Sequence, residues 1–409
     1  MVKIYINKLG RIRDAEIDVK PMLVFTGNSG LGKSYTAFLV DHIYNVIANN
    51  RIKYFVQERT RALGEQNLQE GFTFKFKDLR LWMNQDASQY LGYLTGNKEF
   101  KCDVNYVFEE IDDNAAFRLW AVDEEPLTQV YVNEKSMFFP SAFRDWEMMY
   151  TRSLTRYLTS ALFGKDTQLL PILMPPARAA FMGAKNALQA FNGIGMYAKF
   201  INIYDYLTDA RPRESADEQF YHSMIRRLTG GELELENGQT YLRLSADTRI
   251  PISAAASSIK ELTALLLLIQ KDMNSYKLSV LFEEPEAHVH PMSQDLVADL
   301  IARCFNRGMQ FQITTHSDFI LGRFNQLIRL GNLRKKNPEK FKQFCKENRE
   351  SENLYLDNEQ IGAYYFVEQD GKVLIKEQDI TNGIPYTTFH EIINRQEKID
   401  DLIEQYIEE

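Results

Sequence analysis

The sequence predicts an α/β protein built around a phosphate-binding loop. Gly27 to Ser34 matches the pattern G-x-x-x-x-G-K-[ST] in full. The apolar run Met22 to Thr26 precedes it as a strand, and the helix-periodic segment Tyr35 to Ile47 follows it. Further along the chain, strand-like and helix-like segments alternate as they do in an α/β sheet.

The composition is that of an ordinary globular protein with room for two or three domains. The chain has 409 residues, of which 44% are hydrophobic and 25% charged. No run approaches the roughly 18 apolar residues that span a bilayer, and the first residues read as a strand, so we expect a cytoplasmic protein with no membrane partner. The net charge of −8 argues against nonspecific coating of nucleic acid but leaves room for a local basic groove.

Residues 1–48 are predicted to form the first lobe of the nucleotide-binding fold. Lys3 to Ile6 and Arg13 to Val19 flank the turn Leu9-Gly10-Arg11 as a β-hairpin would. In the loop that follows, glycines let backbone N–H groups curl around phosphates, Lys33 reaches the β and γ phosphates, and Ser34 offers its hydroxyl to Mg²⁺. The residues assigned to the nucleotide are Gly27, Asn28, Ser29, Gly30, Gly32, Lys33 and Ser34. A chance match in a chain of this length has odds of roughly one in a hundred.

The long region 49–228 lacks phosphate-loop chemistry, and we interpret it as a large α+β insertion within the nucleotide-binding fold. Its strand-like pieces are Phe72 to Phe76, Val104 to Phe108 and Gln129 to Val132, and its helix-like pieces are Asp145 to Phe163, Arg178 to Leu188 and Ser215 to Leu228.

Residues 229–330 return to the α/β pattern. Gly231 to Leu244 is a predicted hairpin that turns at Asn237-Gly238. The segments that follow are a helix at Ser257 to Lys271, a strand at Tyr276 to Phe282, a helix at Met292 to Asn306 and a strand at Gln310 to Thr315.

Two carboxylates end the strand in this second lobe. In Leu278 to Glu286 an apolar run leads directly into Glu283 and Glu284. Beside a phosphate loop, one carboxylate at such a strand end holds the Mg²⁺ hydration shell and the next takes a proton from the attacking water. We assign Glu283 to the metal and Glu284 to the base. A solvated sheet edge is the alternative that a pair of glutamates alone would favour.

Residues 331–409 are predicted to form a helical and hairpin region. Asn332 to Arg349 is basic and helical, Ala363 to Val367 and Val373 to Lys376 form a hairpin about Asp370-Gly371, and Ile393 to Glu408 is a last helix. No stretch sustains the several heptads of a long coiled coil.

The segment Glu283 to Pro291 resembles the extended Walker B motif of the ABC-type ATPases of the OLD, RecF, Rad50 and SMC group, especially short bacterial AAA-type proteins of the OLD-like branch. This resemblance implies the fold class of an ABC-type P-loop NTPase head, a mixed sheet flanked by helices, with ATP and Mg²⁺ as cofactors. Most relatives carry Asp where this chain has Glu283.

Two further segments match that group in order. Ala256 to Leu262 resembles its signature motif, in which Ser257 and Ser258 would meet the γ-phosphate of a nucleotide held by a second protomer. Simple helix N-caps are the alternative for these serines, because the glycines of the LSGGQ form are missing. Ile313 to Asp318 resembles the switch-histidine segment, so His316 is assigned a catalytic contact with the γ-phosphate.

Other polar residues receive a plainer interpretation. His288 and His290 have no further ligands in the sequence that would complete a metal site. Arg178 follows Pro175-Pro176-Ala177, which favours an exposed arginine after a turn over a nucleotide contact. A Q-loop glutamine cannot be assigned.

The resemblance implies a homodimer as the minimum active unit, or a larger assembly of dimers. OLD proteins carry a Toprim nuclease, for which this chain has no acidic motif. We therefore predict a sensor or regulatory ATPase like those of Septu-, PARIS- or retron-type anti-phage systems, which control a separate nuclease or toxin. A RecF-like DNA-repair ATPase is the alternative, and it would bind DNA. The ATP-binding subunit of a transporter fits poorly.

Overall fold

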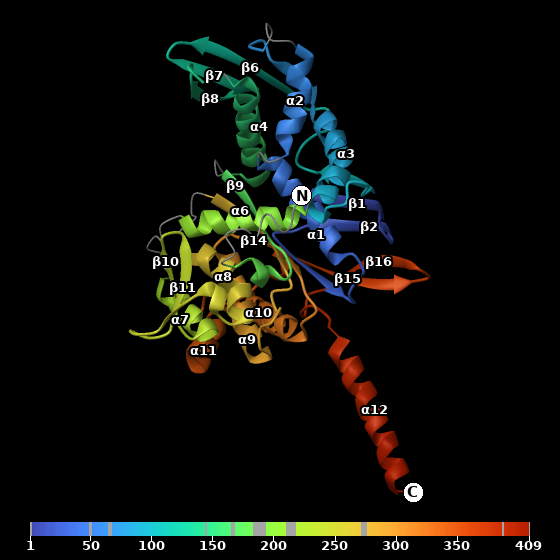
Figure 1. Cartoon of the computed structure of the whole chain (residues 1–409). Coiled ribbons are helices and arrows are strands. Elements are labelled where there is room, and N and C mark those ends of the chain that lie inside the picture. The colour runs from blue at the N-terminus through green and yellow to red at the C-terminus, as the bar shows by residue number, and fades with distance from the viewer. Residues whose placement is uncertain are drawn as a thin grey trace.

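The computed structural model describes residues 2–48, 51–63, 68–143, 145–164, 168–182, 194–209, 218–270, 276–386 and 388–408. In this part of the chain, a nine-stranded mixed sheet runs through the body of the molecule, with helices on both faces (Figure 1). Its strands, in spatial order, are β5 (Cys102–Phe108), β1 (Val2–Leu9), β2 (Ile12–Val19), β16 (Lys372–Glu377), β15 (Ile361–Gln369), β3 (Met22–Gly27), β14 (Gln310–Thr314), β13 (Tyr276–Glu283) and β9 (Gln168–Met174).

Strand β3, which leads into the phosphate loop, lies in the middle of the parallel part of this sheet. It pairs in parallel with β15 on one side and with β14 on the other. Met22 and Val24 belong to one hydrophobic core, and Leu23 and Phe25 belong to a second core on the opposite face. A strand that is covered on both faces must be apolar throughout, which explains the uninterrupted apolar run in the sequence.

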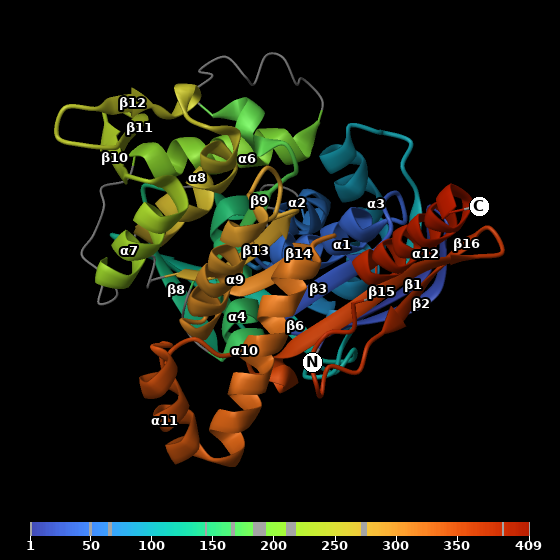
Figure 2. The same ribbon diagram turned by 90° about the horizontal axis from the view of Figure 1, so that it is seen from below.

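Helices cover the two faces of the sheet. Figure 2 shows α9 and α10 in front of β13, β14 and β3, with α1 behind them. The helices that contribute to one core are α1 (Lys33–Ile47), α2 (Ile52–Leu63), α3 (Phe76–Thr95) and α4 (Trp146–Phe163). Those that contribute to the other core are α6 (Gly195–Asp209), α7 (Glu218–Thr229), α8 (Ser257–Gln270), α9 (Pro291–Asn306), α10 (Asp318–Lys336) and α11 (Pro338–Asn348). The described residues thus form a mixed sheet flanked by helices on both faces, as the sequence predicts.

The region 49–228 contributes to two sheets. Strands β5 and β9 are the two edges of the main sheet. A separate four-stranded antiparallel sheet stands above the body together with α2 and α4 (Figure 1). Its strands, in spatial order, are β4 (Phe72–Lys75), β6 (Ala116–Glu124), β7 (Leu127–Val132) and β8 (Lys135–Pro140).

The sequence predictions within 49–228 are partly confirmed. The strands β4, β5 and β7 and the helix α4 lie where they are expected, whereas α2, α3, α6, β6, β8 and β9 are not among the predicted elements. The predicted helix Arg178 to Leu188 is wrong at its start, where a single 3-10 turn, Arg178–Phe181, is followed by extended Met182; residues 183–188 lie outside the described residues. The predicted helix from Ser215 is α7, described from Glu218.

The predicted hairpins are all present. Strands β1 and β2 pair antiparallel at the start of the chain. Strand β10 (Glu232–Glu236) pairs with β11 (Gln239–Arg243), which also pairs with β12 (Arg249–Pro251), and Asn237 and Gly238 turn at φ 51° and 69°. Asp370 and Gly371 make the same kind of turn between β15 and β16, at φ 52° and 73°. Two positive φ values in succession define the type I′ turn that these dipeptides favour.

The basic segment Asn332 to Arg349 is two helices and not one. Helix α10 ends at Lys336 and α11 begins at Pro338, with Asn337 between them in an extended conformation. Proline lacks the N–H that would continue α10, and the Asn337 side chain accepts a hydrogen bond from the Lys340 amide to cap α11. The last helix, α12 (Thr388–Glu408), points away from the body (Figure 1).

Among the helices of the described residues, none combines the length and the apolar character needed to span a bilayer.

Candidate nucleotide site

The predicted phosphate loop and the two carboxylates meet at one edge of the sheet. Strands β3, β14 and β13 are neighbours and parallel, so their carboxyl ends lie together. An open cleft of about 460 Å³ lies at this edge. Its lining residues are Leu9, Gly10, Arg11, Ser29, Gly30, Leu31, Gly32, Lys33, Ser34, Tyr35, Glu284, Thr314, His316 and Val373. Residues far apart in the sequence thus form one site.

The backbone conformation of the loop requires glycine at two positions. Gly27 has φ 120°, and a Cβ there would lie 2.3 Å from the carbonyl oxygen of Phe366 in β15. Gly32 has φ 91° and precedes the first residue of α1. A side chain at either position would be strained, and at Gly27 it would also separate the loop from the neighbouring strand.

Lys33 folds back over the loop. Its ammonium group donates hydrogen bonds to the carbonyl oxygens of Gly27 and Asn28 at 2.9 and 2.8 Å. Burial lowers the pKa of Lys33 to about 8, although the nearby carboxylates Glu284 and Glu286 partly offset this effect. The amine lies at the N-terminus of α1, where the helix dipole also favours an anion.

Glu283 and Ser34 lie side by side beneath the loop. The Ser34 hydroxyl is hydrogen-bonded to the Glu283 carboxylate, whose burial raises its pKa to about 7. Glu283 is 2% exposed, and its Oε1 has no hydrogen-bond partner. A buried oxygen without a partner, next to a serine hydroxyl and a phosphate loop, fits the oxygen ligands that Mg²⁺ prefers.

Glu284 points its half-buried side chain into the cleft, across from the loop. Its backbone is in the left-handed region at φ 46°, and its amide donates a hydrogen bond to the Thr314 carbonyl at 2.9 Å. This conformation is costly for a residue other than glycine, and such strain persists only where the surroundings impose it. Because of this turn, the adjacent carboxylates of Glu283 and Glu284 point in different directions.

His316 approaches the loop from the end of β14. Its Nε2 is 3.5 Å from the Ser29 hydroxyl. Burial, with a smaller contribution from Lys33, lowers its pKa. The Glu286 carboxylate accepts hydrogen bonds from the His316 amide at 2.7 Å and from the Thr315 hydroxyl at 2.9 Å. Glu286 therefore fixes the histidine segment to the strand end that carries Glu283 and Glu284, a role that the sequence did not predict.

Arg178 is fully buried, so the prediction of an exposed arginine is wrong. Its guanidinium donates hydrogen bonds to the carbonyl oxygens of Glu261 (2.7 Å), Pro175 (2.9 Å), Glu283 (2.7 Å) and Glu284 (3.3 Å). It also lies 3.3 Å from the Glu261 carboxylate and stacks over the Phe282 ring at 4.6 Å. Burial lowers its pKa to about 10, yet the group keeps its charge at neutral pH. These carbonyl groups come from three segments, so no local pattern reveals the contact.

Ser257 and Ser258 do not line this cleft. Helix α8 begins at Ser257, and the Ala256 carbonyl accepts the first helical hydrogen bonds, from Ile259 and Lys260. Neither serine is therefore the N-cap residue. Ser257 is exposed at the start of α8 and Ser258 is half-buried.

The other histidines of the Walker B segment have different surroundings. His290 is the N-cap of α9, where its Nδ1 accepts a hydrogen bond from the Met292 amide at 3.3 Å. His288 is exposed at φ 59°. Among the described residues, no group of three or more His, Cys, Asp or Glu side chains is arranged to hold a metal ion. A metal at the cleft would thus depend on serine and phosphate oxygens besides Glu283.

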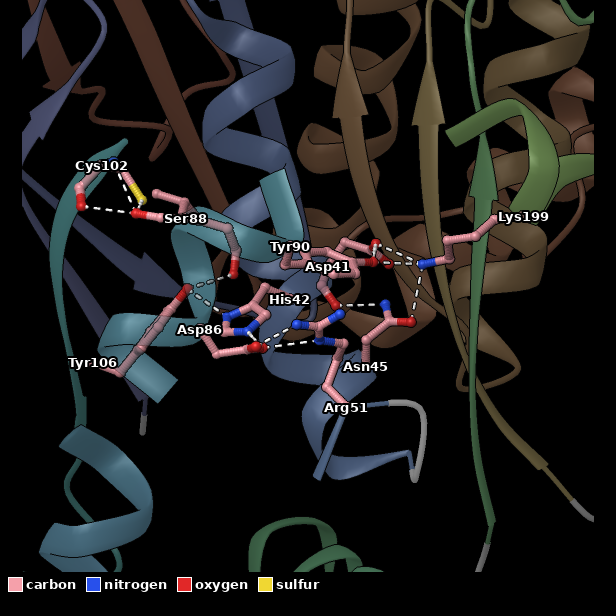
Figure 3. Close-up of polar contacts among 11 residues, drawn as sticks. Asp41, His42, Asn45, Arg51, Asp86, Ser88, Tyr90, Cys102, Tyr106 and Lys199 are labelled. Carbon is pink, nitrogen blue, oxygen red and sulfur yellow. Dashed lines mark hydrogen bonds and ion pairs between the residues drawn. The ribbon is translucent and has the colours of Figure 1, made fainter. Parts of the chain in front are cut away.

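Residues in the second half of helix α1 belong to a buried polar network (Figure 3). His42 contacts the Tyr106 hydroxyl at 2.8 Å and the Asp86 carboxylate at 2.9 Å. The Lys199 ammonium of α6 donates hydrogen bonds to Asp41 at 3.0 Å and to Asn45 at 2.9 Å. The network joins the helix that starts at Lys33 to α3, β5 and α6.

Comparisons with known proteins agree with this site in part. Residues 185–321, about a third of the chain, match the family model described as AAA ATPase domain. No curated protein matches the chain.

Three solved structures are similar over most of the chain. One is an Smc head bound to the C-terminal winged-helix domain of ScpA (13% identity, 92% of this chain and 97% of that one, TM-score 0.42). Another is the Smc head of Pyrococcus furiosus with an extended coiled coil, bound to the C-terminal domain of ScpA (11%, 98% and 100%, TM-score 0.42). The third is the SMC head domain of Thermotoga maritima (10%, 92% and 98%, TM-score 0.31).

The matched family segment includes α8, Glu283, Glu284 and His316, and Glu284 and His316 line the same cleft as the phosphate loop. Residues 185–321 are thus similar to an AAA ATPase domain, and the described residues place a phosphate loop in an α/β fold.

Proposed function

We propose that this protein binds and hydrolyses ATP and that the reaction opens and closes a dimer. The observation that carries the proposal is the convergence of Lys33, Ser34, Glu284 and His316 in one cleft, with buried Glu283 beside Ser34. Each of these residue types stands where phosphoryl transfer needs it.

The chain's own residues divide the work. The backbone of Gly27 to Gly32 and the Lys33 ammonium bind the phosphates, and Ser34 and Glu283 would hold Mg²⁺, which neutralises phosphate charge when bound. Glu284 takes the proton of the attacking water, and its half-buried position gives it access to the cleft. His316, whose Nε2 is 3.5 Å from the Ser29 hydroxyl, contacts the γ-phosphate from that side of the loop.

A second copy of the chain would complete the site. Ser257 and Ser258 do not line the cleft of their own chain, and Ser257 is exposed at a helix N-terminus, which is a ready anion site. In a homodimer, or in an assembly of such dimers, these serines would face the γ-phosphate bound by the partner. ATP then closes the dimer and hydrolysis opens it.

The output we propose is regulatory. The family resemblance supports an ATPase of a bacterial anti-phage system that acts as a sensor and controls a separate nuclease or toxin. A neighbouring gene for such an effector, together with copurification of the two proteins, would support this role.

The test uses the purified full chain with Mg²⁺ and ATP. We expect phosphate release, loss of ATP binding in Lys33→Ala, and a stable ATP-bound dimer without turnover in Glu284→Gln. Normal hydrolysis in Glu284→Gln would contradict the assignment of the base. Strong stimulation by DNA that falls steeply with salt would instead favour the RecF-like alternative.

A further inference from the structure

The C-terminal helix α12 is exposed to solvent over its residues 394–407. It extends from the body (Figure 1), and every described side chain from Asn394 to Ile407 is exposed. Its 21 residues give a rod of about 31 Å. In most proteins the stability of such a helix comes from packing of an apolar face, because propensity alone is marginal in water.

An apolar stripe runs along this helix. It consists of Ile399 (44% exposed), Leu402 (54%), Ile403 (50%), Tyr406 (80%) and Ile407 (76%). The spacing of three and four residues puts these side chains on one face. The opposite face carries the carboxylates Glu397, Asp401 and Glu404. The helix is therefore amphipathic, with one charged face and one apolar face.

Two opposite charges flank the stripe. Arg395 lies along one border and Asp400 along the other, five residues later. In a parallel pair of helices, a residue at the first border faces the partner's residue five positions further on, at the second border. Arg395 would therefore meet Asp400 of a second copy, and the symmetry of the pair makes this contact twice. An antiparallel pair centred on Ile399 and Ile403 would bring the two Asp400 carboxylates together.

We propose that α12 pairs in parallel with α12 of a second copy of this chain. The stripe and its two charged borders are complementary to themselves, which a symmetric homodimer requires. The contact is two heptads long, in keeping with the absence of a long coiled coil. It lies on a different element from the nucleotide cleft and forms without nucleotide, so it goes beyond the proposed ATP-dependent dimer. When both contacts join the same chains, each raises the effective concentration for the other.

The first experiment measures the mass of the full chain by sedimentation without nucleotide. We expect concentration-dependent dimers that disappear in Ile399→Asp/Ile403→Asp, while ATP binding by that variant stays normal. The matched control, Glu397→Lys on the opposite face, should dimerise as the natural chain does. A natural chain that stays monomeric at 100 μM, a concentration on the order of the Kd of a weak contact, would overturn the proposal.

The second experiment exchanges the charges. Arg395→Glu and Asp400→Arg should each weaken self-association by about tenfold, because two attractive contacts become repulsive. An equimolar mixture of the two variants should dimerise again, since every facing pair in the mixed dimer is attractive. Failure of the mixture to recover would exclude parallel self-pairing, and it would do so whether or not the protein hydrolyses ATP.

Discussion

The carboxylate of Glu286 holds the backbone amide of His316 at 2.7 Å, and so joins the end of β13 to the segment after β14. The same side chain accepts a hydrogen bond from the Thr315 hydroxyl, and burial raises its pKa. A third residue that does not line the cleft therefore links the proposed general base, Glu284, to the histidine segment.

Glu286→Gln should slow ATP hydrolysis roughly tenfold, because its single carbonyl oxygen cannot replace both carboxylate oxygens and one charged hydrogen bond is lost. ATP affinity should change by less than about threefold, since Lys33 and the loop are untouched. Phosphate release and equilibrium ATP binding measure the two effects. Thr315→Val, which keeps the contact to the His316 amide but removes the hydroxyl that bonds Glu286 and the Ser317 amide, serves as a comparison. An unchanged rate in Glu286→Gln would show that the histidine segment needs no such anchor.

Arg178→Met should destabilise the fold by about 3 to 5 kcal/mol, because it leaves the buried Glu261 carboxylate without its counter-charge. The double variant Arg178→Met/Glu261→Met should recover much of that loss. Urea unfolding of the natural chain and of both variants provides the measurement. Equal losses in the single and double variants would mean that the carbonyl contacts, and not the ion pair, dominate.

The pH dependence of stability should report Glu283. Burial raises its pKa from 4.5 to about 7, so between these values the folded protein holds a proton that the unfolded chain releases. The free energy of unfolding therefore includes the full contribution of the protonated Glu283 below pH 4.5, and this contribution declines as the pH rises towards 7. Relative to the natural chain, Glu283→Gln should therefore gain up to about 3 kcal/mol between pH 4.5 and 8.

This comparison is made by urea unfolding without nucleotide or Mg²⁺. Glu134→Gln, at an exposed turn, is the control. A constant difference between Glu283→Gln and the natural chain across this pH range would contradict the buried, neutral carboxyl.

The network behind α1 should be sensitive to loss of a single charge. Asp41→Asn leaves the Lys199 ammonium beside neutral groups and should cost about 3 kcal/mol of stability. Asp41→Asn/Lys199→Met removes both charges and should be more stable than the single variant. Thermal or urea unfolding tests this order, and the reverse order would show that Lys199 is satisfied by Asn45 and Tyr90 alone.

The sequence predicts those parts of the site that are local in the chain. The phosphate loop, the Asn237-Gly238 turn and the strand that ends at Glu283 are each specified by a few consecutive residues, and the structure has all of them. Glu286 and Arg178 act through backbone groups of distant segments, for which the sequence has no pattern. The pairing of β3 with β14 and β15 is equally invisible, because an apolar strand fits many neighbours.

The sequence does not predict the start of helix α3 for a different reason. Phe76 continues the apolar alternation of β4 but is the first residue of α3, where Asp78 accepts a hydrogen bond from the Lys75 amide and starts the helix. Such a capping contact between neighbouring residues overrides the strand pattern that precedes it.

The position of β3 also bears on how the protein is made. One neighbour of this strand, β15, leaves the ribosome more than three hundred residues after it, which at 5 to 20 residues per second is a delay of roughly 20 to 70 s. Throughout that interval the nascent chain holds an apolar strand that lacks its β15 partner on one edge. Because Gly27 lies against Phe366 of β15, the phosphate loop can reach its packed position only after these later residues have been added.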